Sequence, residues 1–337
     1  MPGMDIFNED AFSLVSLTAA INKPKYRPGQ ISQAEIFNED GVTTTTVYVE
    51  MRDGQLALVE PTPRGGPGET TGSEKREGIP FRVPHYQRDD AVLADEVQNV
   101  RAFGSDSDLE TVVDRVEKRG ERHAQDLTMT LEHQRCGAIK GVILTKGGKV
   151  LSNLYTDFGV ATPAAVSMEL DVDATDVGEV FDGVRYGIED ALDEPYNGLH
   201  VFAGRDFHTA MWRHKSLKET LLASGIPALQ LRNAVPDVFE FGGATWERYR
   251  TGAAATSDLG SPYIAANEAR VVPIGVTDLF ITRFAPADYE ETVNTLGLPF
   301  YMKQWEMKNG KGREMEVQMN AISLCTRPEV LRKLTLT

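Results

Sequence analysis

The sequence predicts an α+β protein in which helices and strands occupy separate stretches, without a regular βαβ alternation. Three observations support this class. Residues 42–60, which are rich in Thr and Val, and residues 78–86 are predicted to be two extended segments. Residues 105–141 lie in a proline-free window and have helical periodicity. From residue 239 onward, short strand-like runs dominate the chain.

The two extended segments predict the strands of a long hairpin, and "PRGGPGETTGSEKREG" (63–78) between them predicts its tip. A glycine-rich loop after a strand can also cradle a phosphate. A Walker loop, however, places Lys directly after its last Gly, whereas two residues separate Gly72 from Lys75. Pro80 and Pro84 then exclude the helix that would have to follow. The sequence therefore favours a loop tip over a nucleotide site.

A hairpin of this length is expected to contact a neighbouring molecule, because an isolated two-stranded hairpin is only marginally stable in water. This is the first indication of an assembly protein.

Residues 105–141 predict one long helix. Ser107 and Glu110 fit a capping box at its start, where acidic residues also favour the helix dipole. About thirty residues at 1.5 Å per residue span roughly 45 Å, which is more than a compact domain requires. Residues at a 3–4 spacing form one narrow seam, interrupted by a glycine that indicates a close approach or a bend: Leu109, Val113, Val116, Gly120, His123, Leu127 and Leu131.

Residues 169–194 contain ten acidic residues and a single Arg. Asp171 and Asp173 have the D-x-D spacing of a metal site, but the glycine that a calcium loop requires is absent. A helical stripe begins near residue 177 and predicts an amphipathic helix with a solvated acidic face rather than a metal site.

Residues 198–225 predict a strand, a turn at Gly204, and a helix that ends near Gly225. Their three histidines lack the i, i+4 relation and the third ligand of a zinc site, so they are expected to be partly exposed or packed side chains. No G-x-S-x-G elbow occurs, and neither Cys136 nor Cys325 has an evident His partner. The sequence thus predicts no catalytic site, metal site or cofactor.

The 337-residue chain is acidic, with a net charge of −15. Proteins that grip nucleic acid neutralise phosphates with Lys and Arg, so this balance argues against a nucleic-acid-binding protein. Two distant cysteines suit a reducing cytoplasm. No signal peptide and no apolar run of roughly 20 residues is found, so we expect no membrane association.

Three long segments of the sequence resemble the lambda-type major capsid proteins (major capsid protein E family) of tailed double-stranded DNA bacteriophages. They are residues 284–334, beginning "FAPADYEETVNTLGLPFY", residues 85–105, "HYQRDDAVLADEVQNVRAFGS", and residues 239–252, "FEFGGATWERYRTG". The resemblance extends over nearly the whole chain in consistent order.

The resemblance implies the Hong Kong 97-type phage capsid fold. In that fold the chain would divide into an N-terminal arm (1–40), an extended hairpin loop (41–88), a peripheral domain with a spine helix (89–149), an axial domain (150–260), further peripheral strands (261–317) and a C-terminal strand returning to the axial domain (318–337).

The resemblance also implies a non-enzymatic shell protein. Copies of the chain would form pentamers and hexamers of an icosahedral head that encloses DNA without sequence-specific binding. Partners would be a portal, a separate scaffolding protein, a maturation protease and, as a further candidate, a decoration protein. The protein would be in the virion, and in the host cytoplasm during assembly. An encapsulin-like nanocompartment shell is the alternative.

Contacts between subunits are expected at the hairpin tip, where the candidates are Arg64, Glu74, Lys75 and Arg76. Lys75 is the only lysine of the hairpin and therefore the only one there that could form a covalent cross-link to a neighbour. Its solvated, charged surroundings favour a protonated amine, so we expect no such cross-link.

Overall fold

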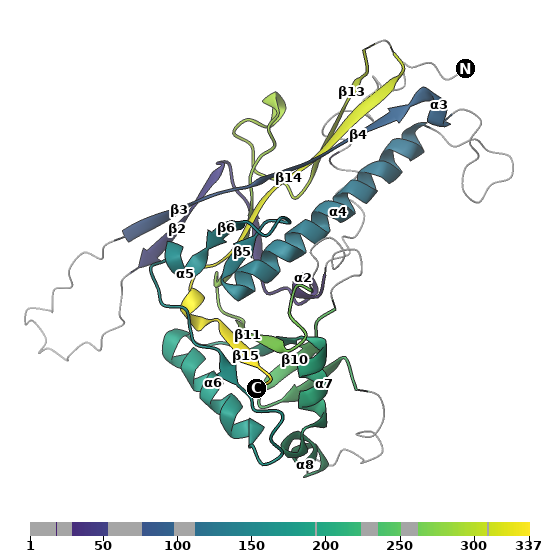
Figure 1. Cartoon of the computed structure of the whole chain (residues 1–337). Coiled ribbons are helices and arrows are strands. Elements are labelled where there is room, and N and C mark those ends of the chain that lie inside the picture. Colours follow the sequence, from purple (N-terminus) through teal and green to yellow (C-terminus); the bar gives the residue numbers. More distant parts are fainter. Residues whose placement is uncertain are drawn as a thin grey trace, which may run out of the picture.

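The computed structural model describes residue 18 and residues 29–52, 76–97, 112–192, 194–223, 235–250, 262–308 and 310–337. The expected α+β class is confirmed within them. A long helix lies along one sheet, and a second sheet carries a layer of helices (Figure 1). No helix in this described part of the chain is long and apolar enough to cross a membrane.

The long helix α4 covers Val112–Lys140, which confirms the described part of the helix expected over 105–141. The expected capping box at Ser107 lies outside the described residues. The helix ends at Gly141, which has a φ of +80° and donates its N–H to the carbonyl of Ala138 (3.1 Å). Three residues of the predicted seam are buried against the neighbouring sheet: Val116, Leu127 and Leu131.

The sheet beside α4 is built around one long strand, β14 (Gly312–Cys325). β13 (Tyr301–Glu306) and β4 (His85–Leu93) pair antiparallel with its first part, and β12 (Phe280–Phe284) pairs with its last five residues. β1 (Asn38–Gly41) joins β12 in parallel at the edge. Alternate residues of β14 share a core with the seam of α4: Met315, Val317 and Met319.

The second sheet has six strands in the order β7-β15-β11-β8-β10-β9. Their bounds are Val166–Ser167, Arg332–Thr335, Glu268–Ile274, Gly198–Ala203, Ala244–Arg248 and Val238–Phe241. The helices that form its core on one side are α6 (Val177–Leu192), α7 (Arg205–Arg213) and α8 (Lys215–Ala223). Phe181 of α6 and Phe207 of α7 both contact Trp246 of β10, with ring centroids 5.0 and 6.3 Å apart.

The helix expected to run from residue 205 to near Gly225 is instead two helices, α7 and α8. The break lies at His214, whose backbone is extended (φ −62°, ψ 142°). Its buried ring accepts a hydrogen bond from the N–H of Ser216 (3.3 Å) and lies 3.1 Å from the carbonyl oxygen of Val172. The side chain therefore caps α8, as an N-cap residue does, and the new helix starts in another direction.

One later strand, β11, joins the second sheet. It falls within the segment 261–317, and it pairs with β8 and β15 in the six-stranded sheet. The last strand, β15, joins this same sheet. The two sheets are thus interwoven by a chain that crosses between them more than once.

Two hairpins and several short helices complete the described structure. β2 (Thr46–Arg52) pairs with β3 (Arg76–Arg82), which confirms the two strands of the expected hairpin, and β5 (Val142–Leu144) pairs with β6 (Val150–Asn153). The short helices are α2 (Gln30–Gln33), α3 (Ala94–Val97), α5 (Leu154–Asp157), η3 (Glu290–Thr292) and η4 (Pro328–Val330).

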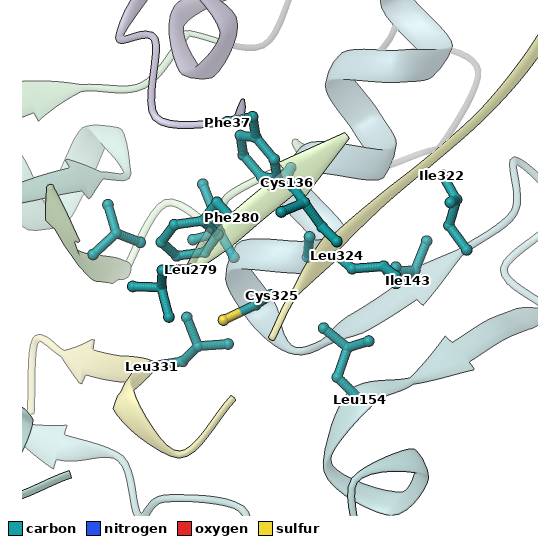
Figure 2. Close-up of a cluster of buried hydrophobic side chains, with 14 of the residues drawn as sticks. Phe37, Cys136, Ile143, Leu154, Leu279, Phe280, Ile322, Leu324, Cys325 and Leu331 are labelled. Carbon is teal, nitrogen blue, oxygen red and sulfur yellow. The ribbon is translucent and has the colours of Figure 1, made fainter. Parts of the chain in front are cut away.

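One hydrophobic core joins segments that are far apart in the sequence. Figure 2 shows Phe37 from the N-terminal segment, Cys136 from α4, Phe280 from β12 and Leu324 from β14 converging in it. Phe202 and Val272, on the side of the six-stranded sheet away from its helices, belong to the same cluster. The end of α4, both sheets and the N-terminal segment therefore share buried surface.

Candidate functional site

The hairpin β2–β3 is fixed to the body by one of its faces. Val47, Val49 and Phe81 are buried in the main core, and Phe81 packs against Phe158 with ring centroids 5.5 Å apart. Tyr48, between the two valines, points to the other face and is 67% exposed. The hairpin leaves the body at one side (Figure 1). Its base is anchored, while a large aromatic side chain on its outer face is free for contact.

Of the four contact residues expected at the hairpin tip, only Arg76 belongs to the described residues. Arg64, Glu74 and Lys75 lie outside the described residues. Arg76 is the first residue of β3, and its backbone pairs in register with Arg52 of β2. Their role between subunits therefore remains a prediction.

The N-terminal segment is held to α4 by a buried carboxylate, that of Glu132. Its oxygens accept hydrogen bonds from the backbone N–H of Ile31 (2.9 Å), the N–H of Ser32 (3.2 Å), the hydroxyl of Ser32 (2.7 Å) and the hydroxyl of Tyr249 (2.9 Å). Burial, followed by the neighbouring carboxylate, raises the pKa of Tyr249 well above its ordinary value, so the hydroxyl stays a donor. Glu132 thus joins α2, α4 and the chain after β10.

Arg135, one helical turn from Glu132, is almost fully buried. Its guanidinium donates to the hydroxyl of Ser32 and to the carboxylate of Glu39, both at 2.6 Å, and lies 5.4 Å from the ring centroid of Phe37. A buried arginine needs such compensation because an unpaired buried charge is costly. Residues 29–39 are therefore clamped to the helix.

A second buried carboxylate lies where α4 meets the six-stranded sheet. Glu268 of β11 is within 3.3 Å of Arg270, 3.2 Å of Lys333 and 3.8 Å of Lys140 at the end of α4. Burial alone would raise the pKa of Glu268, but these cations hold it below its ordinary value. The group links the helix end with β11 and β15.

An ion-pair cluster also fastens β4 to α4. Asp90 of β4 faces Arg119 (2.9 Å) and His123 (2.8 Å) of the helix. Burial opposes ionisation of Asp90, but the hydrogen bond from His123 and the charge of Arg119 lower its pKa overall. Asp90 lies within the 85–105 segment that carries the resemblance, and the cluster fixes this strand to the helix.

Both thiols and two of the histidines are buried. Burial raises the pKa of Cys136 to about 11 and that of Cys325 to about 12, which makes both thiols poor nucleophiles. His208 and His214 are buried, and His200 lies 3.0 Å from Glu247. Within the described residues, no group of three or more His, Cys, Asp or Glu side chains is arranged to hold a metal ion.

The clamp residues were missed from the sequence, although one signal was present. Arg135 lies four residues after Leu131, so it continues the predicted apolar seam with a charged side chain. A charge at such a position indicates a buried partner. That the partners would be Ser32 and Glu39 could not be read from spacing, because they are about a hundred residues away.

Solved structures identify the class of fold. The asymmetric unit of the mature capsid of bacteriophage PhiM1 superposes with a TM-score of 0.52, covering 89% of this chain and 85% of that chain at 12% identity. At this identity the likeness concerns the fold alone. The fold is that of the Hong Kong 97-type capsid proteins, and the expected fold class is confirmed.

Sequence relatives identify the family. A family model described as phage major capsid protein E matches residues 13–336. The major capsid protein of Pseudomonas phage KPP10 is 28% identical, covering 90% of this chain and 91% of its own length. That of Salmonella phage Felix O1 (isolate Felix O1-VT1) is 23% identical, with 95% of each chain covered. The chain belongs to the phage major capsid protein E family, and it is a structural protein of the virion.

Proposed function

We propose that copies of this chain form pentamers and hexamers that close into an icosahedral shell around a double-stranded DNA genome. The observation that carries this proposal, beyond family membership, is the β2–β3 hairpin. Its inner face is buried in the core through Val47, Val49 and Phe81. Its two strands extend away from the body of the subunit (Figure 1). Heterologous contacts of this kind generate rings when the rotation closes.

The proposal assigns each part of the subunit a position in the shell. The six-stranded sheet with α6, α7 and α8 would gather around the capsomer axes, and α4 with the five-stranded sheet would form the peripheral part. Residues 1–40 would act as the N-terminal arm, which Glu132 and Arg135 hold to α4 and which pairs with β12 through β1. The tip of the hairpin, with Arg64, Glu74, Lys75 and Arg76, would overlap a neighbouring subunit.

The proposed partners are a portal, a separate scaffolding protein, a maturation protease and a decoration protein, with assembly in the host cytoplasm. The acidic chain would enclose DNA without sequence-specific binding, because a wall of like charge leaves the packaged polymer mobile. An encapsulin-like shell is a weaker fit, since the matching family model and the relatives above are phage capsid proteins.

Electron microscopy of the purified protein, with and without the candidate scaffold, tests the proposal. We expect closed shells with five- and six-fold capsomers. A protein that stays a 37.1 kDa monomer at high concentration in the presence of its scaffold would contradict it. Shells that form but load an enzyme cargo in place of DNA would support the encapsulin-like alternative.

A further inference from the structure

Two segments of the surface carry a concentration of exposed apolar side chains. The apolar loop, residues 288–298 between β12 and β13, exposes Val293, Leu296 and Leu298. The lysine turn, residues 144–151 from the last residue of β5 to the second residue of β6, exposes Leu144, Val150 and Leu151. Among the described residues, these six make up nearly half of all exposed large hydrophobic side chains. Such clustering marks an interaction surface, whereas scattered single residues would not.

The apolar loop is rigidly built despite its exposure. Gly297 donates its N–H to the carbonyl of Val42 (3.0 Å), and a Cβ at this position would fall 2.0 Å from the carbonyl oxygen of Phe284. The hydroxyl of Thr292 donates to the carbonyl of Ala287 (2.7 Å). Lys303 pairs with Glu291 at 2.6 Å. The loop therefore displays Val293 and Leu296, which are 66% and 64% exposed, on a fixed scaffold, which lowers the entropy cost of docking.

The lysine turn is likewise held in one shape. The N–H of Thr145 donates to the carbonyl of Lys149 (2.8 Å), and the N–H of Gly148 donates to the carbonyl of Thr145 (2.9 Å). Gly148 has a φ of +76°, which a tight turn of this type requires. Val150, at 53% exposure, is thus presented beside the turn rather than folded back onto the body.

The charges of the two segments are opposite. The apolar loop contains Asp288, Glu290 and Glu291 and no cationic residue, while the lysine turn contains Lys146 and Lys149 and no acidic residue. Within the described part of the chain, no ion pair is formed by Glu290 or by Lys149. The lysine turn is cationic on a chain of net charge −15, and complementary charge at the rim of an apolar contact favours one partner over others.

The two segments cannot satisfy each other within one subunit. In Figure 1 the yellow-green loop that precedes β13 stands apart from β5 and β6, which lie beside the end of α4. A ring or shell requires two different surfaces on each subunit that fit one another on adjacent copies. We propose that the apolar loop of one subunit docks on the lysine turn of a second copy of this chain. This inference rests on the proposed function and specifies one of its contacts.

A disulfide-trapping experiment tests the contact directly. The variant carrying Leu296→Cys and Val150→Cys is assembled into particles, oxidised mildly and run on a non-reducing denaturing gel. The background is silent because both native cysteines are buried. We expect multimers of the 37.1 kDa chain from the double variant and monomers from each single variant. The pairing would be overturned if assembled particles of the double variant gave no band other than the monomer. It would also be overturned if Leu296→Cys alone gave dimers.

Charge reversal is a second and independent test of the contact between the apolar loop and the lysine turn. It applies also if the double-cysteine variant does not assemble. Lys149→Glu and Glu290→Lys should each weaken the contact about fivefold and lower particle yield, and their combination should restore the yield. Lys308→Glu, an exposed lysine between β13 and β14 that lies outside both segments, is the matched control and should leave the yield unchanged. A combined variant no better than the worse single one refutes the pairing. Failure of the wild-type chain to form shells would instead refute the proposed function.

Discussion

Replacement of Glu132 by Ala should release the N-terminal segment from α4. The carboxylate accepts hydrogen bonds from two backbone N–H groups, at Ile31 and Ser32, and from the hydroxyls of Ser32 and Tyr249. Without it, the backbone donors and the buried Tyr249 hydroxyl lose their acceptor. A buried donor left unsatisfied costs about 1–3 kcal/mol. Removal of the buried carboxylate also removes its desolvation cost, which offsets part of the loss from the unsatisfied donors. We therefore expect a net local destabilisation of about 4 kcal/mol.

The assay is hydrogen exchange at the backbone amides of residues 30–34. A local loss of about 4 kcal/mol corresponds to roughly a thousandfold faster exchange, if exchange proceeds by local opening. Glu121→Ala is the matched control, because Glu121 lies on the same helix with an exposed side chain, and its removal should change exchange by less than threefold. Glu132→Gln keeps one acceptor oxygen and should fall between the two variants.

The reasoning is refuted if exchange at Ile31 and Ser32 rises by less than about tenfold in Glu132→Ala. It is also refuted if the acceleration is equal across all helices, because that would indicate global destabilisation instead of release of the clamp. Shells of the variant should still show α4 protected, since its seam packs on β14.

Three further predictions concern a buried histidine, the two buried cysteines and the lysine of the hairpin tip. His208 is fully buried with neither ring nitrogen hydrogen-bonded, and burial, helped by nearby Arg248, lowers its pKa to about 4. In the unfolded chain the imidazole binds a proton near pH 6.5, so the free energy of unfolding should fall by about 2–3 kcal/mol as the pH drops from 6.5 to 4. The thermal unfolding of His208→Leu should lack that part of the pH dependence. Cys136 and Cys325 should not react with a thiol reagent in the native protein and should both react in urea; fast native labelling would contradict their burial. Boiled mature particles should run as one band, and a ladder abolished by Lys75→Ala would show a cross-link after all.

Local periodicity predicted the described part of the long helix and α6 from about residue 177, and residue composition predicted both strands of the hairpin. These elements have strong one-sided patterns: Val184, Ile188 and Leu192 recur on one face of α6 and are all buried. The break at His214 was not predicted, because the helical pattern continues through it. The reason for the break is tertiary, since the buried imidazole caps α8 while facing the Val172 carbonyl from another part of the chain.

The existence of a strand is easier to predict from the sequence than the sheet that it joins. Residues on both faces of β11 are buried, so an apolar run of this kind predicts a buried strand without specifying its pairing with β8. The surface features were missed for a related reason. "TVNTLGLP" has the composition of an ordinary loop, and only the structure shows that Gly297 is pinned while Val293 and Leu296 face outward.

The pairing of β14 with its neighbours has a mechanical consequence. Fourteen residues of strand extend about 48 Å and the helix α4 beside it about 43 Å, so the two form a beam of matched length. β4 pairs with nine consecutive residues of β14, and β12 continues along the same strand. A pull along this beam loads many backbone hydrogen bonds at once, in shear, whereas a pull across it would peel them one by one. The subunit is therefore stiffest along the axis of α4, and a wall made from it would resist outward pressure best where that axis lies in the plane of the wall.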